Sequence, residues 1–319
     1  MRRGLSPSRT GARDLVARGR VLVAGSPADK PARMVSPAEP LRLLGEPPPF
    51  VSRAGAKLAG ALDELGVDVE GLRCLDAGAS TGGFTDCLLQ RGASAVTAVD
   101  VGRGQLHDRL RRHPRVEARE RTDVRDLAID GPGAVHYDLV VADLAFISLR
   151  PLASRLLALT APGGQLLVLV KPQFEVGRRH AAAGRGVVTD PSLWAGALRQ
   201  VAAAFADGGG EVAGIVPASV RGAAGNVEFL LHVRVGDPGP ARSGARAPAP
   251  ASHTRLEDQV AAAVARAVPP PPGGAGEPPP PGGTGEPPPP GGAGEPPPSG
   301  RIGEPPPSAG AEGGNPWPS

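Results

Sequence analysis

Hydrophobic residues in the central part of the chain recur in short runs that glycine, proline and charged residues separate. Seven runs have the length and the β-branched content of strands: residues 72–78, 94–101, 115–121, 137–146, 163–172, 211–220 and 226–235. Helical stretches lie between most of them. This alternation predicts an α/β domain with a largely parallel sheet and helices on both faces, and the short connection between the last two runs predicts an antiparallel pair.

The N-terminal segment has a different pattern. It predicts a helix from Ser8 to about Gly19, a strand over residues 21–23 and a turn over residues 25–28. Three consecutive prolines at 47–49 then indicate a linker. We therefore expect a small α/β module over residues 1–45, a Pro-rich linker over 46–49 and the main domain over 50–236.

Composition changes again after residue 236, where Pro, Gly, Ala and Ser predominate. A nine-residue repeat is marked by Glu277, Glu286, Glu295 and Glu304. Such a segment buries too little apolar surface to offset its ordering entropy, so residues 237–319 are predicted to be disordered. Leu256, Val260 and Val264 are spaced by four within residues 254–268, which predicts a transient helix there.

Charge is distributed unevenly although the net charge is only +3. Residues 1–45 contain nine Lys and Arg residues and three acidic residues, which favours an anionic partner near the N-terminus. Cys74 and Cys87 lack a CxxC spacing and are expected to be reduced core thiols. No apolar run approaches the ~20 residues of a membrane span, so we expect a cytoplasmic protein.

A glycine-rich loop, DAGASTGGF, covers residues 76–84 between an apolar strand and a helical pattern. Asp100 ends the following strand, 22 residues after Gly78, where an acidic residue that binds a ribose is expected. The glycines at 78, 82 and 83 lack the GxGxxG spacing of dinucleotide-binding proteins. The loop therefore favours a methionine-derived cofactor without a pyrophosphate.

Four polar residues stand at the edges of predicted elements: Lys57, Asp143, Lys171 and Glu228. Lys171 ends the most apolar strand, where desolvation favours a neutral amine and makes it a candidate general base. Asp143 and Glu228 are placed to orient the two lysines. Each residue alone is typical of a salt bridge, but the set of four indicates catalysis.

Several motifs together carry a family resemblance. They are FVSRAGAKL, CLDAGASTGGFTDCLLQRGA, VTAVDVGRGQL, DLVVADLAFISL, LVKPQFEVGR, GRGVVTDP and GNVEF, and they span nearly all of residues 50–235. This region resembles the TlyA family of ribosomal RNA methyltransferases, which is related to the FtsJ-type 2′-O-methyltransferases. The resemblance implies a Rossmann-like methyltransferase fold, the cofactor S-adenosylmethionine and ribosomal RNA or ribosomal subunits as partner. The implied product is cytidine methylated on its ribose 2′-oxygen.

The resemblance also implies roles for individual residues. Lys57, Asp143, Lys171 and Glu228 match the family's Lys-Asp-Lys-Glu tetrad, with Lys171 as base. Predicted cofactor contacts are Asp76, Gly78, Ser80, Thr81, Gly82, Gly83, Phe84, Asp100, Asp123 and Asp143. Predicted RNA contacts are Arg9, Arg13, Arg18, Arg20, Arg53, Arg178 and Arg185. No metal is expected.

The N-terminal module resembles an RNA-binding domain shared with a protein of the small ribosomal subunit. Most of the first helix of that domain is absent before Met1, so we expect a truncated module. The sequence leaves the oligomeric state open.

Three other functions are compatible with parts of the sequence. Methylation of a base amino group is disfavoured because Asp143-Leu144-Ala145-Phe146 lacks the two prolines of the usual motif. A non-catalytic RNA-binding or assembly factor is disfavoured because all four polar residues are present. A haemolysin-like membrane activity, a label that relatives have carried, has little support from an aromatic content of 3%.

Overall fold

The computed structural model describes residues 9–45, 48–177, 186–236 and 251–268, together with residues 3, 5 and 184. The N-terminal module contains α1 (Arg9–Ala17), β1 (Val21–Val23), β2 (Ser26–Pro27) and β3 (Leu41–Leu43). β1 pairs antiparallel with both other strands. The predicted helix and first strand are confirmed. β3, which pairs with β1 in the structure, was not predicted from its three residues.

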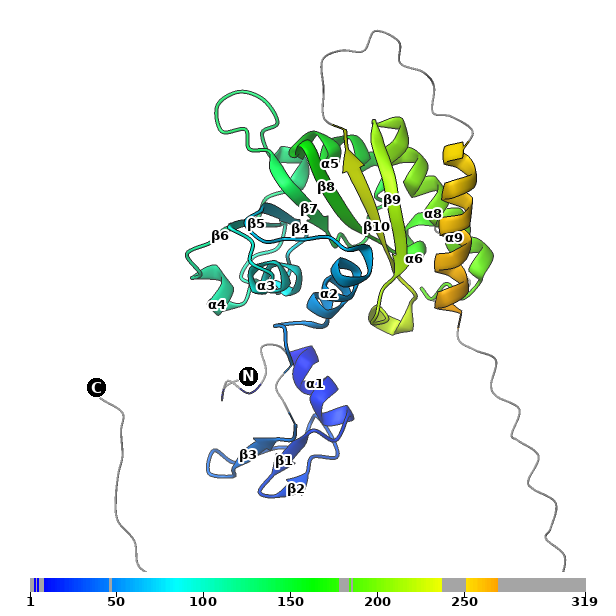
Figure 1. The fold of residues 1–319 in the computed structure, drawn as a ribbon. Coiled ribbons are helices and arrows are strands. Elements are labelled where there is room, and N and C mark those ends of the chain that lie inside the picture. Colours follow the sequence, from blue (N-terminus) through cyan, green and yellow to red (C-terminus); the bar gives the residue numbers. More distant parts are fainter. Residues whose placement is uncertain are drawn as a thin grey trace, which may run out of the picture. The chain divides into compact units, whose positions relative to one another are not determined.

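The main domain is built on one seven-stranded sheet in the order β6-β5-β4-β7-β8-β10-β9 (Figure 1). The strands are β4 (Arg73–Ala77), β5 (Ala95–Asp100), β6 (Val116–Glu120), β7 (Tyr137–Ala142), β8 (Thr160–Val170), β9 (Gly210–Pro217) and β10 (Phe229–Val235). The strands from β4 to β8 pair in parallel, and β10 runs antiparallel to β8 and β9. The predicted parallel sheet and its antiparallel last pair are thus confirmed.

Helices cover both faces of this sheet because successive strand residues point to opposite faces and both sets are apolar. Leu166 and Val168 belong to one core with α5 (Ala153–Leu159) and α8 (Pro191–Asp207). Leu167 and Leu169 belong to the other core with α2 (Arg53–Leu65) and α3 (Gly83–Gln90). The short helices are α4 (Asp108–Arg111) and α6 (Pro172–Glu175), with 3-10 turns η1 (Val124–Asp126), η2 (Arg150–Leu152) and η3 (Ala223–Gly225).

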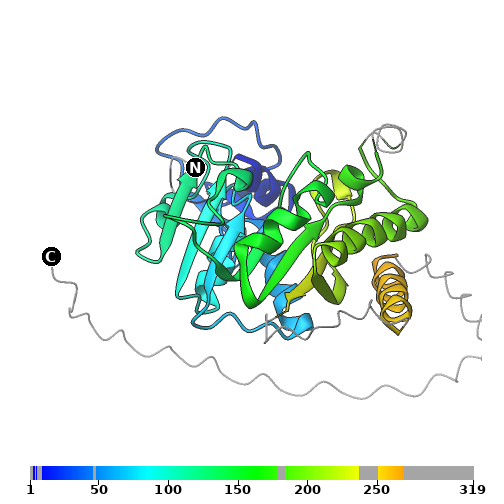
Figure 2. The ribbon, with the colours of Figure 1, turned by 90° about the horizontal axis from the view of Figure 1, so that it is seen from above.

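The last described helix, α9 (Ala251–Ala267), packs beside α8 and β9 (Figure 2). Val260 and Ala263 are buried in the same core as α8. The prediction of a transient helix in a disordered tail is therefore wrong for residues 251–268. The apolar positions spaced by four have a packing partner, which local sequence alone does not reveal. The nine-residue repeats and the rest of the predicted tail lie outside the described residues.

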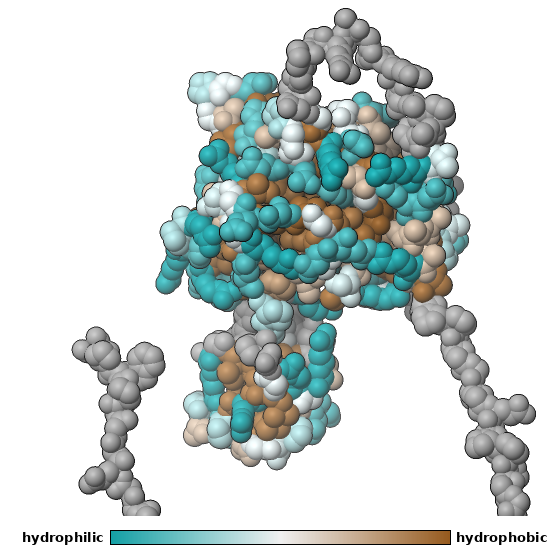
Figure 3. Space-filling view, in the orientation of Figure 1, coloured by the Kyte–Doolittle hydropathy of each residue, from teal (hydrophilic) through white to brown (hydrophobic). Residues whose placement is uncertain are grey.

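The surface of the main domain mixes polar and apolar residues. On the face seen in Figure 3, hydrophobic residues lie near the centre, and hydrophilic residues surround and cross them. None of the helices in the described ranges has the length and apolar character that crossing a bilayer requires. Within the same ranges, His, Cys, Asp and Glu side chains do not gather in threes as they would around a metal ion.

Candidate active site

The predicted cofactor loop begins where β4 ends, at the point where the order of the strands reverses. From β4 the chain builds β5 and β6 on one side and then returns to build β7 on the other. Open α/β sheets bind ligands at such a switch point, beyond the carboxyl ends of the strands. The two strand ends lie side by side here, since the Asp143 amide donates to the Ala77 carbonyl at 3.0 Å.

Glycines let the loop approach its neighbours closely. Gly78 has φ +85°, and a Cβ there would lie 2.7 Å from the carbonyl oxygen of Asp143. A Cβ at Gly83 would lie 2.2 Å from Ser52 Oγ, at the start of α2. Larger residues at these positions would force the loop away from β7 and α2. The glycine pattern is thus required by packing as well as by any ligand.

A pocket of about 230 Å³ lies between this loop and the ends of β7 and β8. Seven predicted residues line it: Gly78, Ser80, Thr81, Gly83, Phe84, Asp143 and Lys171. The lining is completed by Ser52, Ala54, Ala79 and Ala145, which were not among the predicted cofactor contacts. Among the predicted cofactor contacts, Asp76, Gly82, Asp100 and Asp123 do not line this pocket.

Asp76 lies fully buried at the end of β4. Its Oδ2 accepts hydrogen bonds from the Thr85 amide at 2.9 Å and from Thr85 Oγ1 at 2.6 Å. Its Oδ1 has no hydrogen-bond partner. Burial raises the pKa of this carboxyl to about 7, against the lowering effect of Thr85. A buried carboxylate with one oxygen unsatisfied suits a cationic ligand group, such as the ammonium of a methionine moiety.

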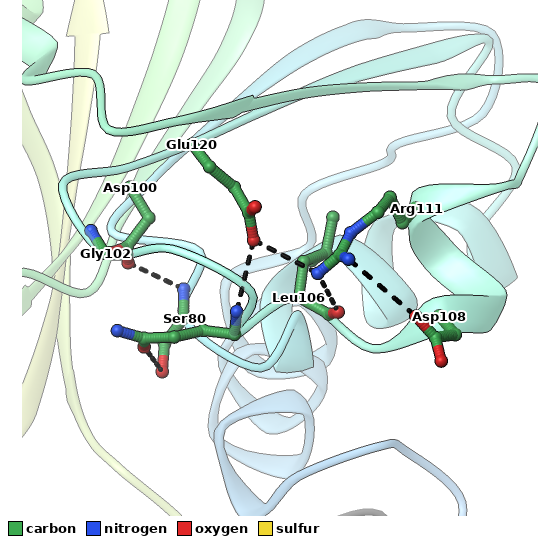
Figure 4. A network of polar contacts seen from close by, with 8 residues as sticks. Ser80, Asp100, Gly102, Leu106, Asp108, Arg111 and Glu120 are labelled. Atoms are coloured by element: carbon green, nitrogen blue, oxygen red, sulfur yellow. Dashed lines mark hydrogen bonds and ion pairs between the residues drawn. The ribbon is translucent and has the colours of Figure 1, made fainter.

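Asp100 is the last residue of β5, and its carboxylate binds backbone amides of two loops, one at Ser80 and one at Gly102. Its Oδ2 accepts from the Ser80 amide at 2.8 Å and its Oδ1 from the Gly102 amide at 2.7 Å (Figure 4). Glu120 continues this network by accepting from the Gln105 amide and from Arg111. Asp100 therefore fixes the loop around Ser80, where φ is +48°. A carboxylate has further lone pairs, so these bonds leave capacity for a ribose hydroxyl.

Asp123 lies apart from the pocket lining and caps the 3-10 turn η1. Its carboxylate accepts from the Arg125 amide at 2.9 Å and pairs with the Arg125 guanidinium at 2.6 Å. This partner lowers the pKa of Asp123. A cofactor contact by Asp123 remains a prediction.

The four candidate catalytic residues form two ion pairs. Lys171 Nζ lies 2.5 Å from Asp143 Oδ1 and donates to the Leu144 carbonyl at 2.9 Å. Lys57 Nζ lies 2.5 Å from Glu228 Oε2. Lys57, Lys171 and Glu228 are buried. Removal of one partner would leave a buried charge without compensation, so each pair constrains both of its members.

Strand register brings the two pairs together. β10 pairs antiparallel with β8, and the last registered pair is Phe229 with Val170. One further step along both chains places Glu228 opposite Lys171, and opposite residues in antiparallel strands have Cα atoms roughly 4.5–5.5 Å apart. Residues from α2, β7, β8 and β10 therefore meet at one edge of the sheet, beside the cofactor loop.

Two aromatic residues adjoin Lys171, and the sequence analysis assigned no role to either. Lys171 Nζ lies 5.9 Å from the centroid of the Phe174 ring. Phe146 lies with its ring centroid 5.4 Å from that of Phe174, is 91% exposed and has φ +64°. A non-glycine residue in this backbone region is strained, and such strain clusters at functional sites. The exposed ring offers a stacking surface next to the ion pairs.

The predicted RNA-binding arginines differ in their surroundings. Arg13, Arg18 and Arg53 are exposed. Arg20 Nε donates to the Leu44 carbonyl at 2.5 Å, so this side chain also joins the residue before β1 to the residue after β3. The Arg9 side chain, Arg178 and Arg185 lie outside the described residues.

Comparison of the chain with known protein families gives two matches. Residues 50–235 match the FtsJ-like methyltransferase family, and residues 2–40 match the S4 domain. The chain belongs to the FtsJ-like methyltransferase family. Helix α9 lies beyond the residues that this match covers.

Relatives of this FtsJ-like methyltransferase include proteins from several bacteria. The 16S/23S rRNA (cytidine-2′-O)-methyltransferase TlyA of Mycobacterium tuberculosis is 45% identical over 235 residues, which is 73% of this chain and 87% of the relative. YqxC of Bacillus subtilis is 38% identical over 77% of this chain and 86% of its own. A solved structure from Streptococcus thermophilus that carries a hemolysin name has a TM-score of 0.63 and 36% identity, and the match covers 82% of this chain and 92% of that chain.

Proposed function

We propose that this protein methylates the ribose 2′-oxygen of cytidine in ribosomal RNA with S-adenosylmethionine as donor. The observation that carries the proposal is the pair Lys171–Asp143 in the lining of the pocket at the glycine loop, beside which the register of β8 and β10 brings the pair Lys57–Glu228. The name of the Mycobacterium tuberculosis relative states the same reaction. The S4 match adds an RNA-binding domain to the same chain.

The residues of the glycine loop fit this cofactor. Asp76 Oδ1 is an unsatisfied acceptor that suits the methionine ammonium, and Asp100 retains acceptor capacity for a ribose hydroxyl. Gly78 leaves backbone room where a side chain would collide with Asp143. When bound, S-adenosylmethionine supplies a methyl group on a sulfonium, which is already activated for transfer.

The protein then has to align the hydroxyl and remove its proton. Lys171 in its amine form accepts the proton of the 2′-hydroxyl, and Asp143 balances the ammonium that results. Asp143 Oδ1 lies 2.5 Å from Lys171 Nζ, which is close enough for this balance. Lys57 and Glu228 give the site a fixed surface next to Lys171, since both residues are buried and form an ion pair with each other. Alignment of reactants is worth ~7 kcal/mol or more in favourable systems, and a positioned base adds a factor of about 10² to 10⁴.

The surface beside the ion pairs suits a nucleotide. Sequence-specific RNA recognition stacks unpaired bases on aromatic side chains. Phe146 presents an exposed ring next to Phe174 and Lys171, so a splayed nucleobase stacked there would bring its ribose toward Lys171. In the N-terminal module, Arg13 and Arg18 are exposed and available to phosphates.

The experiment that tests the proposal is methyl transfer to ribosomal subunits assembled from unmodified RNA, with a labelled cofactor and nucleoside analysis by mass spectrometry. The proposal expects label in 2′-O-methylcytidine. Label in a base-methylated nucleoside would contradict the site of transfer. Absence of label, with RNA binding retained, would favour a non-catalytic assembly factor.

A haemolysin-like activity is the second candidate because the Streptococcus thermophilus relative carries that name. The discriminating measurement is dye release from liposomes at micromolar protein. Our proposal expects no release from vesicles that contain anionic lipids. Release that persists in a Lys171→Ala variant would establish a membrane activity independent of the methyltransferase site.

A further inference from the structure

A second pocket, of about 420 Å³, adjoins the Lys57–Glu228 pair. It lies between α2, the segment after β9 and the last turn of α9. Its lining consists of Gly60, Glu64, Pro217, Ala218, Ser219, Arg221, Val227, Glu228, Arg266 and Ala267. It shares no lining residue with the pocket at the glycine loop. Glu228 is thus the candidate catalytic residue that lines the second pocket.

The segment from β9 to Glu228 is closely fitted around the Glu228 carboxylate. A Cβ at Gly222 would lie 2.1 Å from Glu228 Oε1, so a larger residue there would displace the carboxylate from its present position. The Gly222 amide donates to the Asn226 carbonyl at 2.9 Å, and Ser219 Oγ donates to the Ala56 carbonyl of α2 at 3.0 Å. These bonds set the position of Arg221, which is next to Gly222 in the chain.

The charges of the lining, taken together with Lys57, which pairs with Glu228 from outside the lining, sum to one positive charge. Glu228 is paired with Lys57. Glu64 is paired with Arg266 in a bidentate contact, with one N–O distance of 2.7 Å. Arg221 is exposed, and its recorded partner among the described residues is the Gly225 carbonyl at 3.5 Å, a weak contact. The pocket therefore suits an anion of single charge.

We propose that this pocket is a subsite for a phosphodiester of the RNA next to the methylated nucleotide, with Arg221 as its ligand. The inference rests on the proposed function, which places a ribose at the tetrad. A phosphodiester carries one negative charge, and a guanidinium binds phosphate oxygens in a planar, bidentate geometry. Because the subsite begins at Glu228, a phosphate held there fixes the target ribose relative to Lys171.

Helix α9 forms one wall of this subsite. Arg266 and Ala267 come from its last turn, and the Arg266–Glu64 contact ties that turn to α2, which also carries Lys57. These residues lie outside the range 50–235 that matches the family. The subsite thus depends on a part of the chain that the family match does not cover.

The test compares Arg221→Gln with Arg255→Gln in the full-length protein. Arg255 is an exposed arginine in the first turns of α9, and the same substitution removes the same charge roughly 16 Å along the helix from Arg266. The probe is a ribosomal subunit assembled from unmodified RNA. The measurements are KM and kcat for the subunit, the Kd for S-adenosylmethionine and the salt dependence of subunit binding.

We expect Arg221→Gln to raise KM for the subunit about tenfold. The plot of the logarithm of the binding constant against the logarithm of the salt concentration should become less steep by about 0.7 to 0.9, the contribution of one phosphate contact. The Kd for S-adenosylmethionine should not change, and Arg255→Gln should match the wild type. Arg221→Lys, which keeps the charge, should recover part of the loss.

Equal KM and salt slope in Arg221→Gln and Arg255→Gln, with an active wild type, would overturn the subsite and leave the proposed function intact. A wild type that binds subunits but forms no methylated ribose would contradict the proposed function, and the subsite with it.

Discussion

At the scale of single residues, the presence of lysine and not arginine at the site supports the assignment of Lys171 as a general base. The chain has 35 Lys and Arg residues, but lysine occurs only at positions 30, 57 and 171. Two of these three lysines are buried in ion pairs at the site. Arginine stays protonated in proteins, whereas a lysine amine can accept a proton. Lys57 and Lys171 thus hold the two positions where a titratable amine would matter.

The substitution Lys171→Arg separates charge from basicity. It retains a positive charge for Asp143 but removes the amine, so we expect turnover to fall by a factor of about 10² to 10⁴, as in Lys171→Ala. Single-turnover rates at saturating RNA measure the fall in turnover. The Kd for S-adenosylmethionine is expected to stay within about twofold of the wild-type value. Wild-type rates in Lys171→Arg would show that Lys171 acts only through its charge.

We predict that Asp76 makes cofactor binding dependent on pH. Its pKa of about 7 in the cofactor-free protein means that the carboxyl is largely protonated below that value, where it cannot pair with an ammonium. Affinity for S-adenosylmethionine should therefore rise roughly tenfold from about pH 5.5 to about pH 7, a range in which the methionine amine stays charged. Calorimetric titrations of wild type and Asp76→Asn test this, since the variant should bind weakly with no such rise. A flat profile in the wild type would contradict the role of Asp76.

The same shift has a consequence for stability. A carboxyl whose pKa is higher in the folded state binds more protons there, so the cofactor-free protein loses stability as pH rises from about 4 to 7. We expect cofactor binding to offset this loss, since the proposed contact with the cofactor ammonium would supply a partner for Oδ1.

At the scale of secondary structure elements, the contact between α3 and α2 depends on Gly83. Gly83→Ala would place a Cβ 2.2 Å from Ser52 Oγ and 2.9 Å from the Gly55 amide nitrogen. We expect a loss of about 1–3 kcal/mol in the free energy of unfolding and weaker cofactor binding.

Gly196→Ala in α8 is the matched control, because nothing lies within 4 Å of a Cβ there. It should stabilise the protein by roughly 0.5–1 kcal/mol, since alanine favours a helix. Urea unfolding of both variants gives the comparison. Equal stability of the two would show that α3 does not pack on α2 as described.

Helix α9 gives a second prediction at this scale. Val260→Ala removes two methyl groups from a fully buried side chain, which should cost about 2 kcal/mol of unfolding free energy. Val264→Ala, at a partly buried position on the same helix, should cost less. Urea unfolding measures both. Wild-type stability in Val260→Ala would restore the expectation of a transient helix.

The sequence could predict the elements that have a clear hydrophobic pattern or a recognisable motif. It could not predict features that depend on tertiary contacts. Runs such as 163–172 are long enough to identify β8, and the glycine loop was correctly placed between a strand and a helix, which are β4 and α3. Helix α9 was predicted only as a transient helix, because the partners of its apolar face, α8 and β9, become apparent only in the folded structure. The tilted contact between the rings of Phe146 and Phe174 and the unsatisfied oxygen of Asp76 were likewise out of reach, since both depend on contacts between distant segments.

At the scale of the whole molecule, an S4 domain and an FtsJ-like methyltransferase domain occupy one chain. The first offers exposed arginines to phosphates, and the second gathers two lysines and two acidic residues beside a cofactor loop. The proposed function requires both to act on the same RNA. Binding by the arginines would then raise the local concentration of the target ribose at Lys171.

The most direct test is to map 2′-O-methylated nucleotides in ribosomal RNA from cells that contain the gene, lack it, or carry Lys171→Arg in its place. We predict at least one cytidine that is methylated on its ribose only in cells with the wild-type gene. Identical maps in all three strains would contradict the assignment of this protein as a ribose methyltransferase.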